Sequence, residues 1–210
     1  AARSPRDWET KIGETFRWPT IWLHAYGGLS TNWEGDLAWK ILHRVVKTKV
    51  YLRRVQRLTV SRACHRCGKH ETLNHVFLFC PEAELVWKWV LDILQLIYES
   101  NIALTATNLL LRRDLVPSKQ NKRKINLVAY LIKLTLWHLW EARNKSLFEG
   151  KPMPHTDVIK YIKYSIVQRI RGALSLPGAS PLSVHTLWGV NNVLCFIMGE
   201  DLVLSPNIHI

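Results

Sequence analysis

The 210-residue sequence has no uninterrupted apolar run long enough to cross a membrane. Its two most apolar stretches, 85–98 and 125–140, are broken by charged and polar residues, and neither supplies the ~20 mostly apolar residues that a spanning helix needs. The N-terminus has charged residues where a signal peptide has its apolar segment. We therefore expect an intracellular protein without a membrane partner, whose cysteines are thiols. The chain begins at Ala1, and we expect it to be a fragment.

Acidic residues are scarce. Asp and Glu number 16 against 29 Lys and Arg, which gives a formal net charge of +13. This surplus favours RNA, DNA or another anionic surface as the partner, although a merely soluble basic protein has the same charge. Apolar residues make up 48% of the chain, so disorder throughout is excluded and a folded core is expected.

The motifs of common enzyme classes are missing. The sequence contains no G-x-x-x-x-G-K-[ST] phosphate loop, no H-E-x-x-H, no G-x-S-x-G and no G-x-G-x-x-G. His70 and Glu71 are adjacent, whereas a zinc deaminase has one residue between its His and Glu. We expect no catalytic residue in this chain.

Positive charge is concentrated in two blocks. Residues 40–69 contain ten basic residues and no acidic one, and residues 112–124 contain six basic residues and one acidic residue. Such blocks neutralise phosphates with little sequence preference and with strong dependence on salt. The alternative for each residue is a solvated surface charge. The candidate nucleic-acid contacts are Arg53, Arg54, Arg57, Arg62, Arg66, Lys69, Lys122, Arg123 and Lys124.

Apolar residues recur at spacings of three and four over much of the chain, which predicts a mainly α fold with long amphipathic helices. Helices are predicted from about Asp36, from Pro81 to about Ser100, from about Asn121 to Leu147, and from about Thr156 to Leu174. Residues 50–60 are rich in β-branched residues and predict an extended segment.

The predicted helices divide the chain into four parts. These are an irregular, Trp-rich lead-in over 1–35, a helix, a compact cysteine-containing unit and the following helix over 36–100, a basic loop and helical region over 101–176, and a linker with a C-terminal tail over 177–210. Within the tail, residues 193–198 and 202–204 predict a small β-hairpin.

One motif has specific chemistry, Cys64-x2-Cys67-x7-His75-x4-Cys80. Two cysteines separated by two residues present both sulfurs to one ion, and Gly68 supplies the backbone freedom that this turn needs. Three thiolates and an imidazole favour tetrahedral Zn²⁺, and four protein ligands leave no open position, so we expect one structural ion. The unit is too short for an apolar core, so metal binding is expected to supply much of its folding free energy.

The choice of histidine ligand has alternatives. His65 and His70 lie inside the same unit and compete with His75. His75 is preferred because the four residues before Cys80 allow both ligands to converge from one helical turn or a short loop. Cys195 stands apart and is expected to be a buried thiol.

These residues resemble the reverse-transcriptase zinc-binding domain at the C-terminal end of the polyproteins of LINE-type non-LTR retrotransposons. The resemblance covers about 29–148 and includes softer matches at 36–40, 51–52 and 140–145. The specific matches are Cys64-His-Arg-Cys67-Gly68, Glu71-Thr72, His75-Val76-Phe77, Cys80-Pro81 and Trp87.

The resemblance implies a CCHC zinc knuckle that follows the polymerase and helps to hold template RNA or target DNA during target-primed reverse transcription, with access to chromosomal DNA in the nucleus. It implies the four zinc ligands given above, with Glu71 and Thr72 in supporting or capping positions. The sequence lacks the paired-aspartate motif of the polymerase and an apparent endonuclease domain. Two alternatives are a zinc-stapled helical scaffold that docks on the polymerase portion, and a non-functional retrotransposon remnant.

Overall fold

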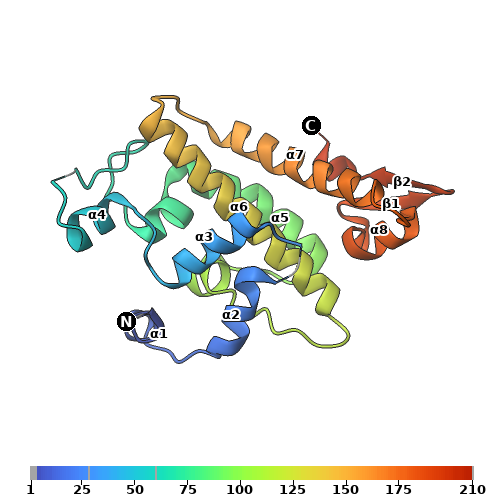
Figure 1. Ribbon diagram of the computed structural model, residues 1–210, viewed down its shortest axis with the longest axis horizontal. Helices are drawn as coiled ribbons and strands as arrows, with labels where there is room; N and C mark the ends of the chain where they lie inside the picture. Colours follow the sequence, from blue (N-terminus) through green and yellow to red (C-terminus); the bar gives the residue numbers. More distant parts are fainter. Residues whose placement is uncertain (1–3, 28, 60, 210) are drawn as a thin grey trace.

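The computed structural model describes residues 4–27, 29–59 and 61–209, and over these residues the fold is mainly α (Figure 1). The helices are α1 (Ser4–Ile12), α2 (Trp18–Tyr26), α3 (Asn32–Leu42), α4 (Lys49–Val55), α5 (Pro81–Tyr98), α6 (Lys122–Phe148), α7 (His155–Leu174) and α8 (Pro181–Trp188). Short π-helical turns lie at His75–Phe79 and Ala106–Leu110, and 3-10 turns at Val190–Asn192 and Pro206–Ile208. No helix in the described part of the chain combines the length and apolar character of a membrane span.

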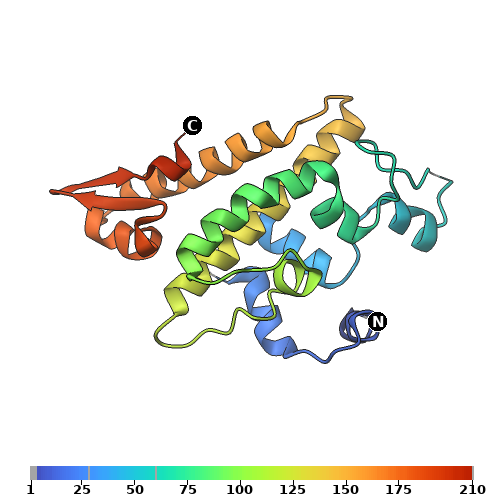
Figure 2. The ribbon, with the colours of Figure 1, turned by 180° about the vertical axis from the view of Figure 1, so that it is seen from behind.

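The centre of the fold is α6, of whose 27 residues 16 are buried. It packs against α3, α5 and α7, and α5 and α6 lie side by side in both views (Figures 1 and 2). Burial of apolar side chains from several helices around one central helix accounts for most of the stability of such a body. The metal-ligand segment follows α4 and leads directly into α5, at the end of the molecule where α6 ends.

The long helices confirm the prediction from periodicity. Observed α5, α6 and α7 begin and end within two residues of the predicted positions. Pro81 occupies the first turn of α5, where its missing N–H costs nothing, and Glu82 and Glu84 lie at the positive end of the helix. The predicted hairpin is also present as β1 (Cys195–Met198) paired antiparallel with β2 (Asp201–Leu204), from Cys195 opposite Leu204 to Met198 opposite Asp201. Cys195 is buried, as expected.

The prediction of an irregular lead-in over 1–35 is wrong, since α1, α2 and the first turn of α3 lie there; residues 1–3 and Gly28 are outside the described part. Tertiary contacts stabilise α1, whose Trp8 is 1% exposed and donates from Nε1 to the carbonyl oxygen of Leu42 at 2.9 Å. The start of α3 is set by a capping box between Thr31 and Glu34, four residues before the predicted start.

One further prediction is wrong. The extended segment over 50–60 is instead largely helix α4, because the Thr48 hydroxyl accepts from the Tyr51 N–H and starts a helical turn despite the β-branched residues; Val60 lies outside the described residues. The C-terminal linker and tail contain α8, capped by Ser180. Ile210 is not described, but Trp188, Leu194 and Ile208 are buried, so this region is part of the core.

Candidate metal centre and basic surface

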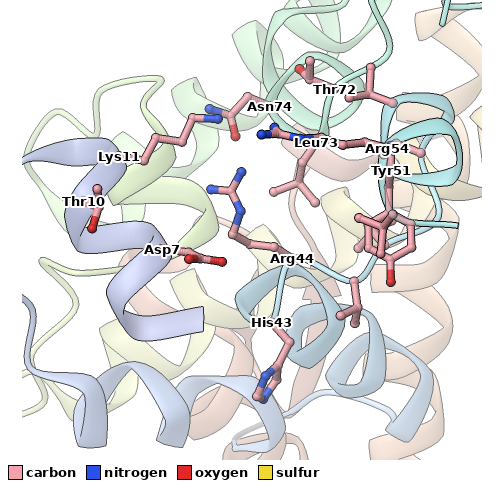
Figure 3. Close-up of a pocket in the computed structure, with 15 residues that line it drawn as sticks. Asp7, Thr10, Lys11, His43, Arg44, Tyr51, Arg54, Thr72, Leu73 and Asn74 are labelled. Atoms are coloured by element: carbon pink, nitrogen blue, oxygen red, sulfur yellow. The ribbon is translucent and has the colours of Figure 1, made fainter. Parts of the chain in front are cut away.

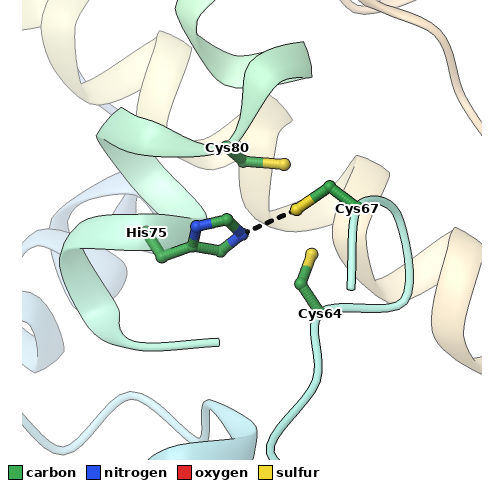
Figure 4. A group of neighbouring side chains, drawn as sticks. All are labelled: Cys64, Cys67, His75 and Cys80. Carbon is green, nitrogen blue, oxygen red and sulfur yellow. Dashed lines mark hydrogen bonds between the residues drawn. The ribbon is translucent and has the colours of Figure 1, made fainter. Parts of the chain in front are cut away.

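Four side chains converge where the chain passes from the knuckle into α5 (Figure 4). One ligand atom from each of Cys64, Cys67, His75 and Cys80 lies within 4.8 Å of the others, and the Cys67 Sγ and His75 Nε2 atoms are 3.3 Å apart. Sulfur ligands about 2.3 Å from a tetrahedral zinc lie roughly 3.8 Å from one another, so the spacing and the donor set both fit Zn²⁺. The cluster is the site of one structural zinc ion.

A tight knuckle presents the first two cysteines. The Cys64 N–H donates to the Lys69 carbonyl at 2.6 Å, the Gly68 N–H donates to the Cys64 carbonyl at 2.9 Å, and an isolated β-bridge joins Ala63 to His70. Gly68 has a φ of 75°, a left-handed conformation that a residue with a Cβ adopts only with strain. The expected role of this glycine is therefore confirmed.

The surroundings of Cys64 favour its thiolate. Hydrogen bonds from the Cys80 side chain, from His75 and from the backbone N–H groups of Arg66 and Cys67 lower the pKa of Cys64 to about 3, against the opposing effect of burial. A thiolate is the form of cysteine that binds a metal ion. The surroundings thus favour the metal-binding form at Cys64, the thiol that accepts the hydrogen bond from Cys80.

The other two ligands are the first residue of a π-helical turn, His75–Phe79, and the residue directly after it, Cys80. The Cys80 N–H donates to the His75 carbonyl at 2.7 Å, and this hydrogen bond holds two residues five positions apart close together. The Thr72 hydroxyl accepts from the His75 N–H at 3.1 Å and fixes the start of this segment. His75 and Cys80 converge from a helical turn, as expected. The competing candidates His65 and His70 are exposed and lie outside the cluster.

Glu71 attaches the metal unit, residues 61–80, to the helical body formed by α5, α6 and α7. Its side chain is 1% exposed, and Oε1 accepts from the Lys49 N–H at 2.8 Å and from the Arg143 Nη2 at 2.6 Å. Arg143 belongs to α6, and its guanidinium lies 4.8 Å from the ring centre of Trp140. The two segments that carry the sequence resemblance, 64–87 and 140–145, therefore meet through a buried ion pair.

Half of the first basic block is displayed beside the metal unit. Arg53, Arg54 and Arg57 lie on or just after α4, Arg62 and Lys69 lie on the knuckle, and all five are exposed. Arg66 differs, because its guanidinium nitrogens are buried and have no hydrogen-bond partner within the described part of the chain. The hydrogen bond with Cys64 and burial raise the pKa of Cys80, and the charge of Arg66 opposes this shift only in part.

The second basic block lies elsewhere. Lys122, Arg123 and Lys124 form the first turn of α6, whereas the metal unit contacts its last turns, and the 27 residues of α6 span ~40 Å. Lys124 pairs with Glu99. Arg112, also in this block, is fully buried, and burial lowers its pKa to about 10. The structure therefore does not bring the two blocks into one surface, and the burial of Arg112 has no signal in the sequence.

Comparison with known proteins supports the assignment of the metal unit. Residues 10–87 match the family described as zinc-binding in reverse transcriptase. Over 183 residues the chain is 27% identical to the transposon TX1 uncharacterized 149 kDa protein of Xenopus laevis. The aligned region covers 87% of this chain and 13% of that protein, so the chain corresponds to a small part of its relative.

Proposed function

The chain carries a reverse-transcriptase zinc-binding domain of a LINE-type transposon polyprotein, and we propose that it holds template RNA or target DNA during target-primed reverse transcription. The observation that carries this proposal is the row of exposed basic side chains on the segment that the metal ion stabilises. Arg54, Arg57 and Arg62, together with Lys69, have no carboxylate within 4.0 Å among the described residues. Cations without partners are available to phosphates.

The zinc ion supplies rigidity in this proposal, and the chain's own cations supply binding. Four protein ligands close the metal site, so it offers no position for an activated water. The knuckle holds Arg62 and Lys69 at its two ends, joined by the Ala63–His70 bridge. Fixed cations lose less conformational entropy when they meet a strand of phosphates.

The second basic turn extends the proposed surface only for long ligands. Lys122 and Arg123 are exposed at the other end of α6. The length of α6, ~40 Å, corresponds to about 12 base pairs of duplex at 3.4 Å each. We infer that a short duplex engages the metal-unit end alone, and that target DNA in the nucleus is long enough to reach both.

Salt titration tests the proposal. The variant Arg57→Ala/Arg62→Ala/Lys69→Ala is compared with Lys160→Ala/Arg171→Ala, which removes exposed charges from α7. We expect the first variant to reduce the slope of log K against log salt by about 0.7 to 0.9 for each phosphate that it no longer neutralises, and the control to leave the slope unchanged. Equal slopes in wild type and variant, or no binding of RNA or DNA by the zinc-loaded chain, contradict the proposal.

A docking function has one observation in its favour. Trp33 on α3 is 69% exposed, and its ring centre lies 6.5 Å from that of Trp137. Exposed tryptophan is typical of a surface that another protein covers. If this face docks on the polymerase portion of the polyprotein, Trp33→Ser weakens that association and leaves nucleic-acid binding by the isolated chain unchanged.

A further inference from the structure

A cavity of about 870 Å³ lies between α1, α4 and the segment that follows α3 (Figure 3). Three cationic side chains from separate elements line it: Lys11 from the end of α1, Arg44 just after α3, and Arg54 from α4. Figure 3 shows the ends of these side chains turned toward one another beside Asn74. Asp7 is the one carboxylate among the lining residues.

The three cations are close enough to repel one another. Burial, then Arg44 and then Arg54, lower the pKa of Lys11. Burial is also the main cause that lowers the pKa of Arg44, with Asp7 opposing it and Arg54 adding to it. The Nη1 atom of Arg44 is buried and has no hydrogen-bond partner among the residues that the structure describes. Like charges brought together without enough counter-charge cost free energy that a bound anion recovers.

Arg44 is held in place rather than free to move to solvent. Its guanidinium lies 4.8 Å from the ring centre of Trp8, and Trp8 is itself fixed by its hydrogen bond to Leu42. Arg44 also has a φ of 56°, the strained left-handed conformation that non-glycine residues adopt rarely. A strained backbone and a stacked side chain both keep this charge at the cavity.

The rest of the lining combines neutral hydrogen-bonding groups with apolar walls. Thr10, Thr72 and Asn74 supply hydroxyl and amide groups, while Tyr51 supplies an aromatic ring. The apolar walls are Val45, Val46, Val50, Val55 and Leu73. Asn74 directly precedes the ligand His75, so the cavity adjoins the metal centre.

We propose that this cavity binds one phosphate group of the nucleic acid, held by Lys11, Arg44 and Arg54. The volume is in the range of pockets that take a nucleotide-sized ligand. Cations fix the phosphate, and the tyrosine and the apolar walls accommodate the sugar or base attached to it. This inference rests on the proposed function and adds to it a definite site, two of whose residues, Lys11 and Arg44, are not among the contacts expected from the sequence.

Paired variants test the site in the zinc-loaded full chain. Lys11→Gln and Arg54→Gln remove cavity cations without touching Trp8, and Arg44→Gln removes the third. The matched controls are Arg6→Gln, exposed on α1, and Lys47→Gln, exposed beside the cavity without lining it. Each cavity variant is expected to weaken binding of single-stranded RNA about three- to tenfold and to reduce the salt slope by at most about 0.7, the value for one phosphate, while the controls change affinity less than twofold.

Two forms of one oligonucleotide, with a 5′-phosphate or a 5′-hydroxyl, show whether the cavity binds a terminal phosphate or an internal phosphodiester. If wild type prefers the 5′-phosphate and Lys11→Gln abolishes the preference, the site takes a terminal phosphate. If both forms lose affinity equally, the site takes an internal phosphodiester. Circular dichroism and zinc content show whether Arg44→Gln remains folded; if it does not, Lys11→Gln and Arg54→Gln decide the test.

The binding experiments distinguish an error in the cavity proposal from an error in the proposed function. If wild type binds RNA and the cavity variants behave as the controls do, the cavity proposal is overturned and the proposed function stands. If wild type binds no nucleic acid, the proposed function is overturned. In that case the cavity is tested with inorganic phosphate alone. If phosphate raises the Tm of the wild-type protein but not that of Lys11→Gln, the cavity is an anion site. If phosphate does not raise the wild-type Tm, the cavity proposal is overturned.

Discussion

Residues 61–70 of the metal unit contribute a single buried side chain, Cys64, whereas α6 alone contributes 16 to the helical body of α5, α6 and α7. The body is stabilised by burial of apolar surface, which is spread over many side chains. The knuckle has no comparable apolar contribution, and its order depends on four ligand atoms and a few backbone hydrogen bonds. The same perturbation should therefore affect the two regions very differently.

Removal of the metal ion should separate the two regions most clearly. We expect Cys64→Ser/Cys67→Ser to lose zinc and the order of the knuckle, since the binding free energy of structural zinc is ~10 kcal/mol or more in small domains and is folding free energy there. The helical body should retain most of its circular dichroism at 222 nm. Zinc content by elemental analysis and amide hydrogen exchange measure the two effects in one preparation.

Cys195→Ala is the control for that variant. Cys195 lies in β1, outside the metal cluster, so this substitution should leave one zinc ion per chain. A folded, reduced wild-type protein without zinc would contradict the site. Loss of all helical signal on metal removal would show instead that the body depends on the knuckle.

Breaking the ion pair between the two regions should have the next largest effect. Arg143→Met leaves the Glu71 carboxylate buried without its cation, and removal of one partner from such a pair costs about 3–5 kcal/mol. The double variant Glu71→Gln/Arg143→Met should cost less than the sum of the single variants. Urea unfolding of all four proteins measures the coupling, and Lys151→Met, from an exposed pair, should change stability by less than about 0.5 kcal/mol. If the unfolding free energies lost by the two single variants add up to the loss in the double variant, Glu71 and Arg143 are not coupled.

Acid and base should affect the two regions in opposite ways. Burial lowers the pKa of Lys133 in α6 to about 7, while the unfolded chain retains the ordinary value of 10.5. Between these values the unfolded chain binds more protons, so the stability of the body should rise from pH 7 to 9 by up to about 1.4 kcal/mol per pH unit. The metal unit should weaken as acid protonates its thiolates.

Lys133→Met tests this pH dependence. The side chain is 1% exposed and donates to the carbonyl of Gly27 at 2.8 Å, so the variant removes a buried amine rather than a surface charge. Its unfolding free energy should lose the rise above pH 7, measured against wild type and against the exposed Lys160→Met on α7. If the unfolding free energy of Lys133→Met still rises above pH 7, another titratable group causes the pH dependence.

Replacement of glycine by alanine should destabilise the metal unit and stabilise the helical body. Gly68→Ala forces a side chain into a left-handed conformation and should cost about 1 kcal/mol, seen as about fivefold weaker zinc binding in competition with a chelator. Gly172→Ala, in the exposed part of α7 with open space around the added Cβ, should stabilise the body by about 0.5–1 kcal/mol. If both substitutions change stability in the same direction, the proposed strain at Gly68 is contradicted.

The sequence predicted the features that depend on local spacing. Long runs of period 3.6 identified α5, α6 and α7, and the spacing of Cys64, Cys67, His75 and Cys80 identified the ligand cluster. Short helices were missed because capping and distant packing stabilise them, as the hydrogen bond from Trp8 to Leu42 illustrates. The cavity of Lys11, Arg44 and Arg54 was not foreseen, because its residues come from three elements and only their packing places them together.

The link between Glu71 and Arg143 also sets an order of events during synthesis on the ribosome. All four ligands lie within 17 residues, so the knuckle can bind zinc soon after Cys80 leaves the exit tunnel. Arg143 follows Glu71 by 72 residues, and the Glu71 carboxylate remains without that cation until most of α6 has been translated. The metal unit is then a preformed surface on which the end of the nascent α6 docks, and delivery of zinc can precede folding of the body.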